Sequence, residues 1–334
     1  MKISVIVPAF NAEPFLERAV TSLLATGHAD LEVLIVEDGS TDGTLQTAQR
    51  LLQEHPEQVR LLRHPGGANR GVSATRNLGI AQAGGDAVCF LDADDYVLPH
   101  RFDRAVQILQ SRSEVDGVYD STAISVQDQA AGAGLGGSVD GAIFGLSIAC
   151  EGEHLLRQLL RGYPWGSDAF LCRRSLFDRT GVFDETLRIA EDCHLWFRAA
   201  ALGRIVPGEL TRPVAVYVRH AANTFHYRIE RKVDMIRAMA RAWPSVRAGT
   251  APSTASVYRE GMTDYLVNTL IVCREAACPD VAWAAIRACV ASPTTRVLCD
   301  TRVLRQIAWL TRETLMPRTF PSASPLRPMP HREH

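Results

Sequence analysis

Short runs of apolar, largely β-branched residues alternate with segments of helical periodicity through the N-terminal third of the chain. The apolar runs, which we predict to be strands, are residues 3–7, 31–36, 59–62 and 87–91. The helical segments between them are residues 13–25, 44–53 and 72–83. Alternation of strand and helix is typical of a parallel sheet covered by helices. The sequence therefore predicts an α/β fold with a Rossmann-like, mostly parallel sheet flanked by helices.

Polar side chains follow each of the four predicted strands. Asn11 comes after the first strand, Asp38 after the second, His64 after the third, and Asp92 and Asp94 after the fourth. In open α/β sheets, ligands bind outside the carboxyl ends of the strands. We therefore expect these side chains to converge on one pocket.

Three carboxylates stand directly behind the fourth predicted strand, at Asp92, Asp94 and Asp95. Proteins hold Mg²⁺ and Mn²⁺ with one or two carboxylates together with phosphate oxygens. The cluster therefore predicts a divalent metal that bridges a diphosphate. The alternative is a turn rich in Asp that caps the next helix, because Asp is favoured in turns and at helix N-caps.

Composition and charge limit the classes of partner. Of the 334 residues, 46% are hydrophobic and 22% are charged, and the formal net charge is -1. These values are ordinary for a globular protein and predict no nucleic-acid partner and no general attraction to an acidic membrane. The opening apolar run is cut by Pro8, and no stretch is long enough to span a bilayer. We expect a cytoplasmic protein without a transmembrane segment, for which peripheral contact with the inner face of the membrane stays open.

Eight cysteines are scattered along the chain without a Cys-x-x-Cys pair or a matching pair of histidines. This pattern excludes a zinc framework. We expect the thiols to be reduced and mostly buried.

Five longer motifs occur in a fixed order. They are Val-Pro-Ala-Phe-Asn at 7–11, Val-Glu-Asp-Gly-Ser-Thr-Asp at 36–42, Gly-Val-Ser-Ala-Thr-Arg-Asn-Leu-Gly at 71–79, Phe-Leu-Asp-Ala-Asp-Asp at 90–95, and Gly-Val-Phe-Asp-Glu at 181–185 followed by Glu-Asp-Cys-His-Leu-Trp-Phe-Arg at 191–198. Together they resemble the GT-A fold glycosyltransferases of family 2, the large inverting family that includes cellulose, chitin and hyaluronan synthases. The resemblance covers residues 2–225.

The resemblance implies a site for a nucleotide-diphosphate sugar donor, with a UDP-sugar as the first candidate. Asp92 and Asp94 match the family's Asp-x-Asp pair, which implies contacts to the ribose and to Mn²⁺ or Mg²⁺, and Asp95 could share the metal. Such an ion would neutralise the charge that develops on the leaving diphosphate. Arg76 could reach the diphosphate or the base, as could Arg70. The alternative for Arg76 is a solvated charge on a helix surface.

The nucleoside end of the donor involves the first two motifs. An ionised carboxylate at Asp38 can accept the N3 proton of a pyrimidine ring. The backbone near Pro8 and the side chains of Phe10 and Asn11 could frame the base, with Glu13 close by. The other polar residues of the second motif are also explained as a turn and a helix N-cap.

Inversion at the anomeric carbon needs one general base that deprotonates the acceptor hydroxyl. Glu191 and Asp192 begin a predicted helix. By resemblance Asp192 is the base and Glu191 is the alternative. The helix N-terminus stabilises their ionised forms, whereas the adjacent carboxylate and closure over substrates raise the pKa. Without the preceding motif, both residues would be interpreted as ordinary first-turn acids.

The acceptor side is less specified. Tyr163 and Trp165 lie on a predicted loop, where their rings could stack on a sugar or close the core. Arg219 and His220 follow a predicted strand where relatives often carry a similar element, so His220 could contact the metal or a phosphate. The implied acceptor is a sugar, a lipid-linked glycan or a protein, in surface polysaccharide or glycoconjugate synthesis.

Two other functional classes stay open. A sugar-nucleotide nucleotidyltransferase also uses an α/β sheet and paired carboxylates, but it normally starts with a Gly-rich basic loop, and here Pro-Ala-Phe-Asn-Ala occupies residues 8–12. A non-catalytic nucleotide-sugar-binding or protein-binding relative is disfavoured by the intact carboxylates. A dehydrogenase is disfavoured because no Gly-x-Gly-x-x-Gly follows a strand.

Changes in composition divide the chain into three parts. We predict a GT-A domain at 1–226, a helical C-terminal region at 227–315 and a Pro-rich, disordered tail at 316–334. Residues 127–138 are rich in Gly and Ala and predict a mobile loop inside the first domain.

Overall fold

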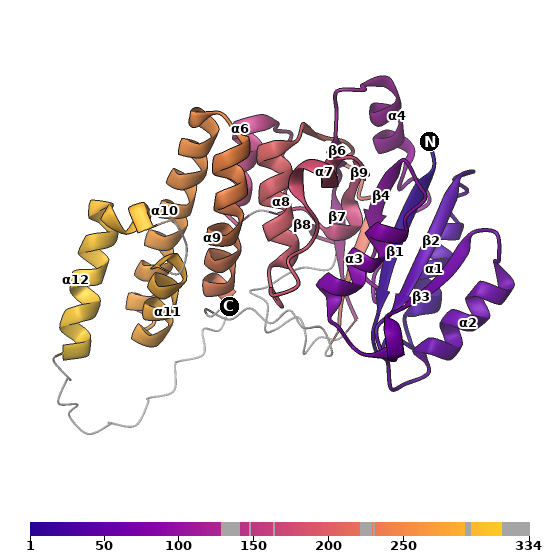
Figure 1. The fold of residues 1–334 in the computed structure, drawn as a ribbon, viewed down its shortest axis with the longest axis horizontal. Coiled ribbons are helices and arrows are strands. Elements are labelled where there is room, and N and C mark those ends of the chain that lie inside the picture. The colour runs from indigo at the N-terminus through magenta and orange to yellow at the C-terminus, as the bar shows by residue number, and fades with distance from the viewer. Residues whose placement is uncertain are drawn as a thin grey trace, which may run out of the picture.

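A seven-stranded sheet forms the centre of the computed structural model (Figure 1). The structure describes residues 1–127, 141–146, 148–162, 164–220, 229, 231–290 and 295–315, with only the backbone of Thr295 and of residues 312–315. The strands follow the order β10-β6-β9-β4-β1-β2-β3. Their bounds are β1 Ile3–Ala9, β2 Leu31–Glu37, β3 Val59–Arg63, β4 Ala87–Phe90, β6 Gly117–Tyr119, β9 Phe170–Arg173 and β10 Ile205–Pro207.

The first four strands along the chain, β1 to β4, are parallel to one another and end at the same edge of the sheet. β1 pairs with β2 and β4 in a register that sets Ala9 opposite Glu37 and Ile6 opposite Phe90. β3 extends the sheet with Arg63 opposite Glu37. The residues that follow these strands therefore lie at one edge, as predicted. The sheet is mostly rather than wholly parallel, because β9 runs antiparallel between β4 and β6.

Both faces of the sheet are buried under helices. Ile3 and Val5 of β1 belong to one core together with α1 and α2, whereas Ile6 belongs to a second core together with α3 and α8. This alternation follows from the two-residue period of a strand that is covered on both sides. The helices are α1 Leu16–Leu24, α2 Thr44–Glu54, α3 Val72–Gln82, α4 Asp103–Ser111, α6 Gly152–Leu160, α7 Leu176–Thr180 and α8 Glu191–Leu202. The first three agree closely with the predicted helical segments.

The helix α3 packs closely against β1. A Cβ atom at Gly79 would lie only 2.4 Å from Ile6 Cγ2, so a larger residue there would push the helix away from the sheet. This contact fixes the position of the helix that carries Arg76.

A smaller four-stranded sheet lies next to the acidic residues that follow β4. Its order is β5-β11-β7-β8, with β5 Tyr96–Val97, β7 Thr122–Val126, β8 Ile143–Phe144 and β11 Ala215–Arg219. β11 pairs antiparallel with β5, which directly follows Asp95. The sequence predicts the strand β11 but not this sheet, because β5 and β8 have only 2 residues each. The pairing brings His220, the residue after β11, to the acidic residues.

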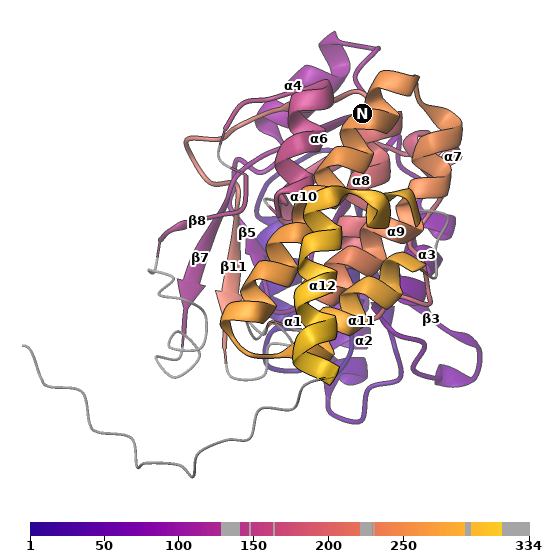
Figure 2. The same ribbon diagram turned by 90° about the vertical axis from the view of Figure 1, so that its left-hand side faces the viewer.

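The C-terminal helices extend the molecule on the far side of α8 from the large sheet (Figures 1 and 2). They are α9 Arg231–Gly249, α10 Pro252–Glu275, α11 Pro279–Val290 and α12 Thr301–Leu315. Ile236 and Met239 of α9 belong to the same buried cluster as Phe170 of β9 and Trp196 of α8. The helical region therefore shares a core with the sheet. Within the described part of the chain, no helix is long and apolar enough to cross a membrane.

Three predictions from composition fall on parts of the chain that the structure does not describe. They are the domain boundary at 226, the tail at 316–334 and nearly all of the predicted mobile loop, residues 128–138. They stay predictions.

A buried arginine, Arg101, connects β4, β6 and β9 of the large sheet. Arg101 is only 1% exposed. Its Nη1 donates to Asp120 Oδ2 at 3.1 Å, its Nε to the backbone oxygen of Asp168 at 2.6 Å, and its Nη2 to Cys89 Sγ at 3.2 Å. Burial raises the pKa of Asp120 to about 6, and the positive charge of Arg101 opposes this shift. The guanidinium thus connects β4, the end of β6 and the segment before β9.

Replacing Arg101 by Met should lower the free energy of unfolding by about 3–5 kcal/mol, because one partner of a buried ion pair is left without its counter-charge. Urea denaturation monitored by circular dichroism measures the change. Arg104→Met is the matched control, since Arg104 is exposed on α4 and its side chain bonds only Gln107 among the residues that the structure describes. It should change stability by less than about 0.5 kcal/mol. Equal stabilities of the two variants would contradict the assigned role of Arg101.

Candidate active site

The three acidic residues after β4 occupy different environments. The side chains of Asp92 and Asp94 are 38% and 29% exposed, whereas Asp95 is buried. Asp95 Oδ1 accepts a hydrogen bond from the Val218 backbone N–H at 2.8 Å. Burial raises the pKa of Asp95 well above its usual value, and Asp94 adds to the shift. Asp95 therefore links the acidic loop to β11, and Asp92 and Asp94 are the carboxylates accessible to a ligand.

Asp94 is held by residues from two other elements. Its Oδ2 lies 3.2 Å from His220 Nε2, and the His220 ring stacks on Phe15 with centroids 4.5 Å apart. Arg18 Nη2 donates to the backbone oxygen of Asp94 at 2.6 Å. Burial and the charge of Asp92 raise the pKa of Asp94, and His220 opposes the shift. Sequence reasoning missed Arg18, although its spacing of three from Phe15 places both on one face of a helix.

A buried guanidinium connects the acidic loop to α8. Arg76 is 3% exposed, and its Nη2 lies 2.7 Å from Asp92 Oδ1 while its Nη1 lies 2.9 Å from Glu191 Oε1. The guanidinium also lies over the Phe183 ring, 5.2 Å from its centroid. Burial lowers the pKa of Arg76, but Asp92 and Glu191 more than offset this effect and keep the pKa above its ordinary value. The alternative of a solvated charge on a helix surface is therefore wrong.

Glu191 and Asp192 begin α8, as the sequence predicts. Burial, together with the neighbouring charge of Asp192, raises the pKa of Glu191 to about 7 against the opposing charge of Arg76. Asp192 Oδ1 accepts a hydrogen bond from the backbone N–H of Cys193 at 2.6 Å. The two acids are therefore distinct, because Glu191 is paired with Arg76 and Asp192 is bound at the helix end by a backbone group.

The motif at 71–79 holds the loop that precedes these acids. The Asn77 side chain donates to the Phe183 backbone oxygen at 3.0 Å and accepts from the Phe183 N–H at 2.9 Å. Ser73 Oγ donates to the backbone oxygen of Leu187 at 3.3 Å. Two motifs that lie more than a hundred residues apart in the sequence therefore form one unit. The sequence shows both motifs but not this contact, since nothing local to either motif indicates it.

Asp38 organises the loop between β3 and α3. Its Oδ1 accepts from the Arg70 N–H at 2.7 Å, and its Oδ2 accepts from the Gly71 N–H at 2.9 Å. Gly39 follows in the left-handed region with a φ of 76°, and a Cβ there would lie 2.7 Å from Asn69 N. Glycine is therefore required where these two loops meet. A carboxylate has further lone pairs, so Asp38 keeps the capacity to accept the N3 proton of a base.

The residues after β1 divide between an exposed ring and a turn. Phe10 is 50% exposed, whereas Asn11 Oδ1 accepts from the Thr41 N–H at 2.9 Å. Glu13 Oε2 accepts from the Gly43 N–H at 2.9 Å, which satisfies the start of α2. Pro8 lies in β1, opposite Val36 of β2. The geometry thus gives Glu13 and Asn11 structural bonds and leaves Phe10 open to a ligand.

Trp165 belongs to the core. It is 1% exposed, and its ring stacks on Tyr119 at 5.3 Å and on Phe170 at 5.2 Å. The interpretation of Trp165 as a sugar-stacking residue is therefore wrong, and core closure is correct. Tyr163 lies outside the described residues. Arg219 is the last residue of β11, is 4% exposed and lies over the Tyr217 ring.

The acidic loop fits an ion that is shared with a nucleotide better than an ion held by protein alone. In the described ranges of the chain, no group of three or more His, Cys, Asp or Glu side chains is arranged to hold a metal. Asp92, Asp94 and His220 supply carboxylate and imidazole donors. Mg²⁺ in nucleotide sites uses one or two carboxylates and takes its remaining ligands from phosphates and water. This donor set therefore fits Mn²⁺ or Mg²⁺ together with a diphosphate.

Comparison with known proteins shows which family the N-terminal part of the chain resembles. Residues 4–130 match the model of glycosyl transferase family 2. Over 207 residues, 60% of this chain and 57% of the relative, the sequence is 34% identical to the succinoglycan biosynthesis protein ExoU of Rhizobium meliloti. Residues 4–130 are therefore similar to glycosyltransferase family 2. It is also 42% identical to an uncharacterised glycosyltransferase of Nostoc sp. over 118 residues, 35% of each chain. The matches thus span about a third to just over half of these two relatives' length.

Solved structures show that the chain has the GT-A fold. TarS 1–349 of S. aureus in complex with UDP-GlcNAc superposes with a TM-score of 0.62 at 18% identity, over 94% of this chain and 92% of that one. The mannosyltransferase PcManGT of Pyrobaculum calidifontis in complex with GDP-Man and Mn²⁺ gives a TM-score of 0.56 at 20% identity, over 94% and 84%. The predicted mostly parallel sheet with a C-terminal helical region is confirmed.

The raised pKa of Glu191 predicts a pH-dependent stability. The pKa of about 7 in the folded state exceeds the ordinary 4.5, so the group favours the folded state below pH 4.5 and loses this contribution as the pH rises through 7. The free energy of unfolding of the wild type, relative to Glu191→Gln, should therefore fall by on the order of 3 kcal/mol between pH 4.5 and 7.5. Urea titrations at a series of pH values measure it. A difference that stays constant across this range would refute the shift.

Proposed function

We propose that the protein is a metal-dependent, inverting glycosyltransferase that moves a sugar from a nucleotide-diphosphate sugar, a UDP-sugar in the first instance, to a hydroxyl acceptor. The observation that carries the proposal is the bridge from Asp92 through Arg76 to Glu191. It joins the loop suited to a diphosphate and its ion to the acids suited to the acceptor. Such an arrangement puts charge stabilisation beside the leaving diphosphate and proton transfer beside the attacking hydroxyl.

On the donor side, Asp92, Asp94 and His220 are assigned to hold Mn²⁺ or Mg²⁺, which when bound neutralises the charge on the leaving diphosphate. Arg76 is a buried cation bonded to Asp92 and is positioned to interact with an oxyanion beside that residue. Phe10 is assigned to cover the base, and Asp38, held by two backbone N–H groups, is assigned to accept its N3 proton. Support comes from the complexes of structural neighbours with UDP-GlcNAc and with GDP-Man and Mn²⁺.

On the acceptor side, Asp192 is assigned as the general base. Glu191 is engaged by Arg76 and is assigned to position that guanidinium rather than to take the proton. Asp192 has no guanidinium partner like that of Glu191, and it accepts hydrogen bonds from the backbone N–H and the thiol of Cys193. A carboxylate has further lone pairs, so Asp192 keeps the capacity to accept from an acceptor hydroxyl. Similarity to a succinoglycan biosynthesis protein supports an acceptor in surface polysaccharide or glycoconjugate synthesis.

The proposed metal role predicts that UDP binds far more tightly in Mn²⁺ than in EDTA. Asp94→Ala should weaken UDP binding in Mn²⁺ by about tenfold or more, because the ion loses a carboxylate ligand. Isothermal titration calorimetry measures both effects. Asp103→Ala, an exposed first-turn acid of α4, is the matched control and should bind UDP like the wild type. Equal affinity in EDTA and in Mn²⁺ would exclude the metal assignment.

The proposed base predicts that catalysis and binding separate in one variant. Asp192→Asn keeps the shape of the side chain but cannot accept a proton, so transfer from a UDP-sugar to an oligosaccharide acceptor should fall by about 10²–10⁴-fold. UDP affinity should stay within about twofold, because Asp192 is assigned to the acceptor side and the metal ligands are intact.

Glu191→Gln tests the division of roles within the acidic pair. If Glu191→Gln abolished transfer while Asp192→Asn retained it, the base would be Glu191. If both variants transferred at the wild-type rate, the proposed mechanism would be wrong.

A further inference from the structure

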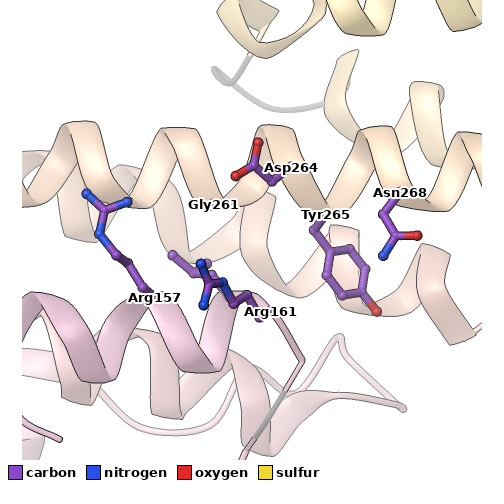
Figure 3. A pocket seen from close by; sticks show the side chains of 7 residues that line it. Arg157, Arg161, Gly261, Asp264, Tyr265 and Asn268 are labelled. Carbon is purple, nitrogen blue, oxygen red and sulfur yellow. The ribbon is translucent and has the colours of Figure 1, made fainter.

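A cavity of about 280 Å³ opens between α6 and α10, and the proposed reaction does not use it (Figure 3). Figure 3 shows that Arg157 and Arg161 come from the α6 side, whereas Tyr265 and Asn268 project toward them from α10. The lining residues are Arg157, Leu160, Arg161, Gly261, Asp264, Tyr265 and Asn268. The volume is close to the lower limit for small-molecule sites, about 300 Å³, which fits one ring-sized group.

The cavity results from the way in which the two helices meet. A Cβ atom at Gly261 would lie 2.7 Å from Leu160 Cδ1, so α10 and α6 approach closely at this point. α6 then ends, because Arg161 is its C-cap and Gly162 adopts a φ of 93° that turns the chain away. α10 continues past this point, and Tyr265 and Asn268 line the opening together with Arg161.

The charges around the cavity favour an anion. The Arg161 side chain is exposed and forms no hydrogen bond or ion pair with any of the described residues. Arg157 is paired with Glu260 only at 3.4 Å, with both side chains about half exposed, and such pairs contribute little. Asp264 also lines the cavity and is paired with Arg302 at 2.7 Å, so the cavity has two guanidinium groups and one carboxylate. Two guanidinium groups are therefore available to bind a carboxylate or phosphate.

The other polar groups of the cavity suit a hydroxylated ring. The Asn268 amide is exposed and has no hydrogen bond among the described residues, so it offers both a donor and an acceptor. The Tyr265 ring lies beside Asn268, and Lys232 Nζ lies over this ring at 5.1 Å from its centroid. Aromatic faces pack against the apolar faces of sugar rings. Guanidinium, amide and aromatic ring together match a sugar that carries a negative charge.

We propose that this cavity binds an anionic sugar unit, bearing a carboxylate or a phosphate, that belongs to the acceptor glycan. Arg161 and Arg157 bind the oxyanion, and Asn268 binds ring hydroxyls beside Tyr265. The assignment to the acceptor rests on the proposed function. Leu155 and Leu159 of α6 belong to the same buried cluster as Leu195 and Trp196 of α8, the helix that begins with Glu191 and Asp192. The cavity therefore lies beside a helix that packs against the helix of the proposed general base.

Direct binding of single sugars tests this inference without turnover. Glucuronic acid and glucose 6-phosphate, titrated into the full chain and followed by NMR, should bind about tenfold more tightly than glucose or inorganic phosphate. Arg161→Gln should weaken binding of both anionic sugars by about tenfold, because a charge-assisted hydrogen bond is lost. The exposed Arg104→Gln of α4 is the matched control and should bind like the wild type. A preference for glucuronic acid or for glucose 6-phosphate distinguishes a carboxylate from a phosphate source.

Three results would overturn the inference. Inorganic phosphate that binds as tightly as glucose 6-phosphate would show a site for anions only. Unchanged sugar affinity in Arg161→Gln, accompanied by lower stability, would show that Arg161 acts only as a cation at the C-terminus of α6. Absence of binding by either anionic sugar would contradict the site directly. UDP binding in Mn²⁺ should be unchanged in Arg161→Gln. UDP binding therefore tests the proposed function, and sugar binding tests the cavity, so that either proposal can fail without the other.

Discussion

A buried guanidinium lies between carboxylates from distant parts of the chain, and the geometry of the candidate active site depends on it. Arg76 contacts Asp92 after β4 and Glu191 at the start of α8. Removing one partner from a buried ion pair costs about 3–5 kcal/mol because the other charges stay buried without compensation. Without Arg76, Asp92, Glu191 and Asp192 would repel one another. The same charge that permits the acids to assemble is also positioned to interact with a diphosphate.

The position of Arg76 is fixed by a series of contacts that starts in the sheet. The missing side chain at Gly79 lets α3 approach Ile6 of β1, which sets the helix over the parallel strands. Asn77, one residue after Arg76, then bonds both backbone groups of Phe183. The loop before α8 is thereby held to the same helix as the guanidinium. In this chain the motif at 71–79 therefore supports the loop before the acids of α8 and also supplies Arg76.

The sequence predicts the elements and the edge of the sheet where the site lies, because both depend on local information. Apolar periodicity gives the first four strands and three helices, and the parallel order places Asp38 and Asp92 at one edge. The difference between Asp95 and its neighbours could not be predicted. It depends on the bond from the Val218 N–H to Asp95, and this bond accompanies the pairing of β11 with β5, a strand of only 2 residues. The core position of Trp165 was equally hidden, since an aromatic residue on a loop gives the same local pattern whether it binds a sugar or packs inside.

Buried and half-buried arginines are the residues whose positions the sequence predicts least well. No sequence pattern indicates the positions of Arg18 and Arg101, and the pattern around Arg76 also fits a residue on a helix surface. The reason is that charged residues are rarely buried unless they are paired. Their partners are backbone oxygens and carboxylates far away in the sequence, such as Asp94 and Asp120. Only the three-dimensional arrangement brings these partners together. In contrast, Glu191 and Asp192 are recognisable from the sequence because they follow a motif and begin a helix.

A crystal structure of the protein with UDP and Mn²⁺ is the most direct test of the central claim that one site joins the acidic loop, Arg76 and the acids of α8. We predict that the ion is coordinated by Asp94 or Asp92 and by the diphosphate, and that Arg76 remains bonded to Glu191 while it faces the phosphates. A nucleotide bound away from the carboxyl edge of β4, with Asp92 and Asp94 both free of the ion, would contradict the account.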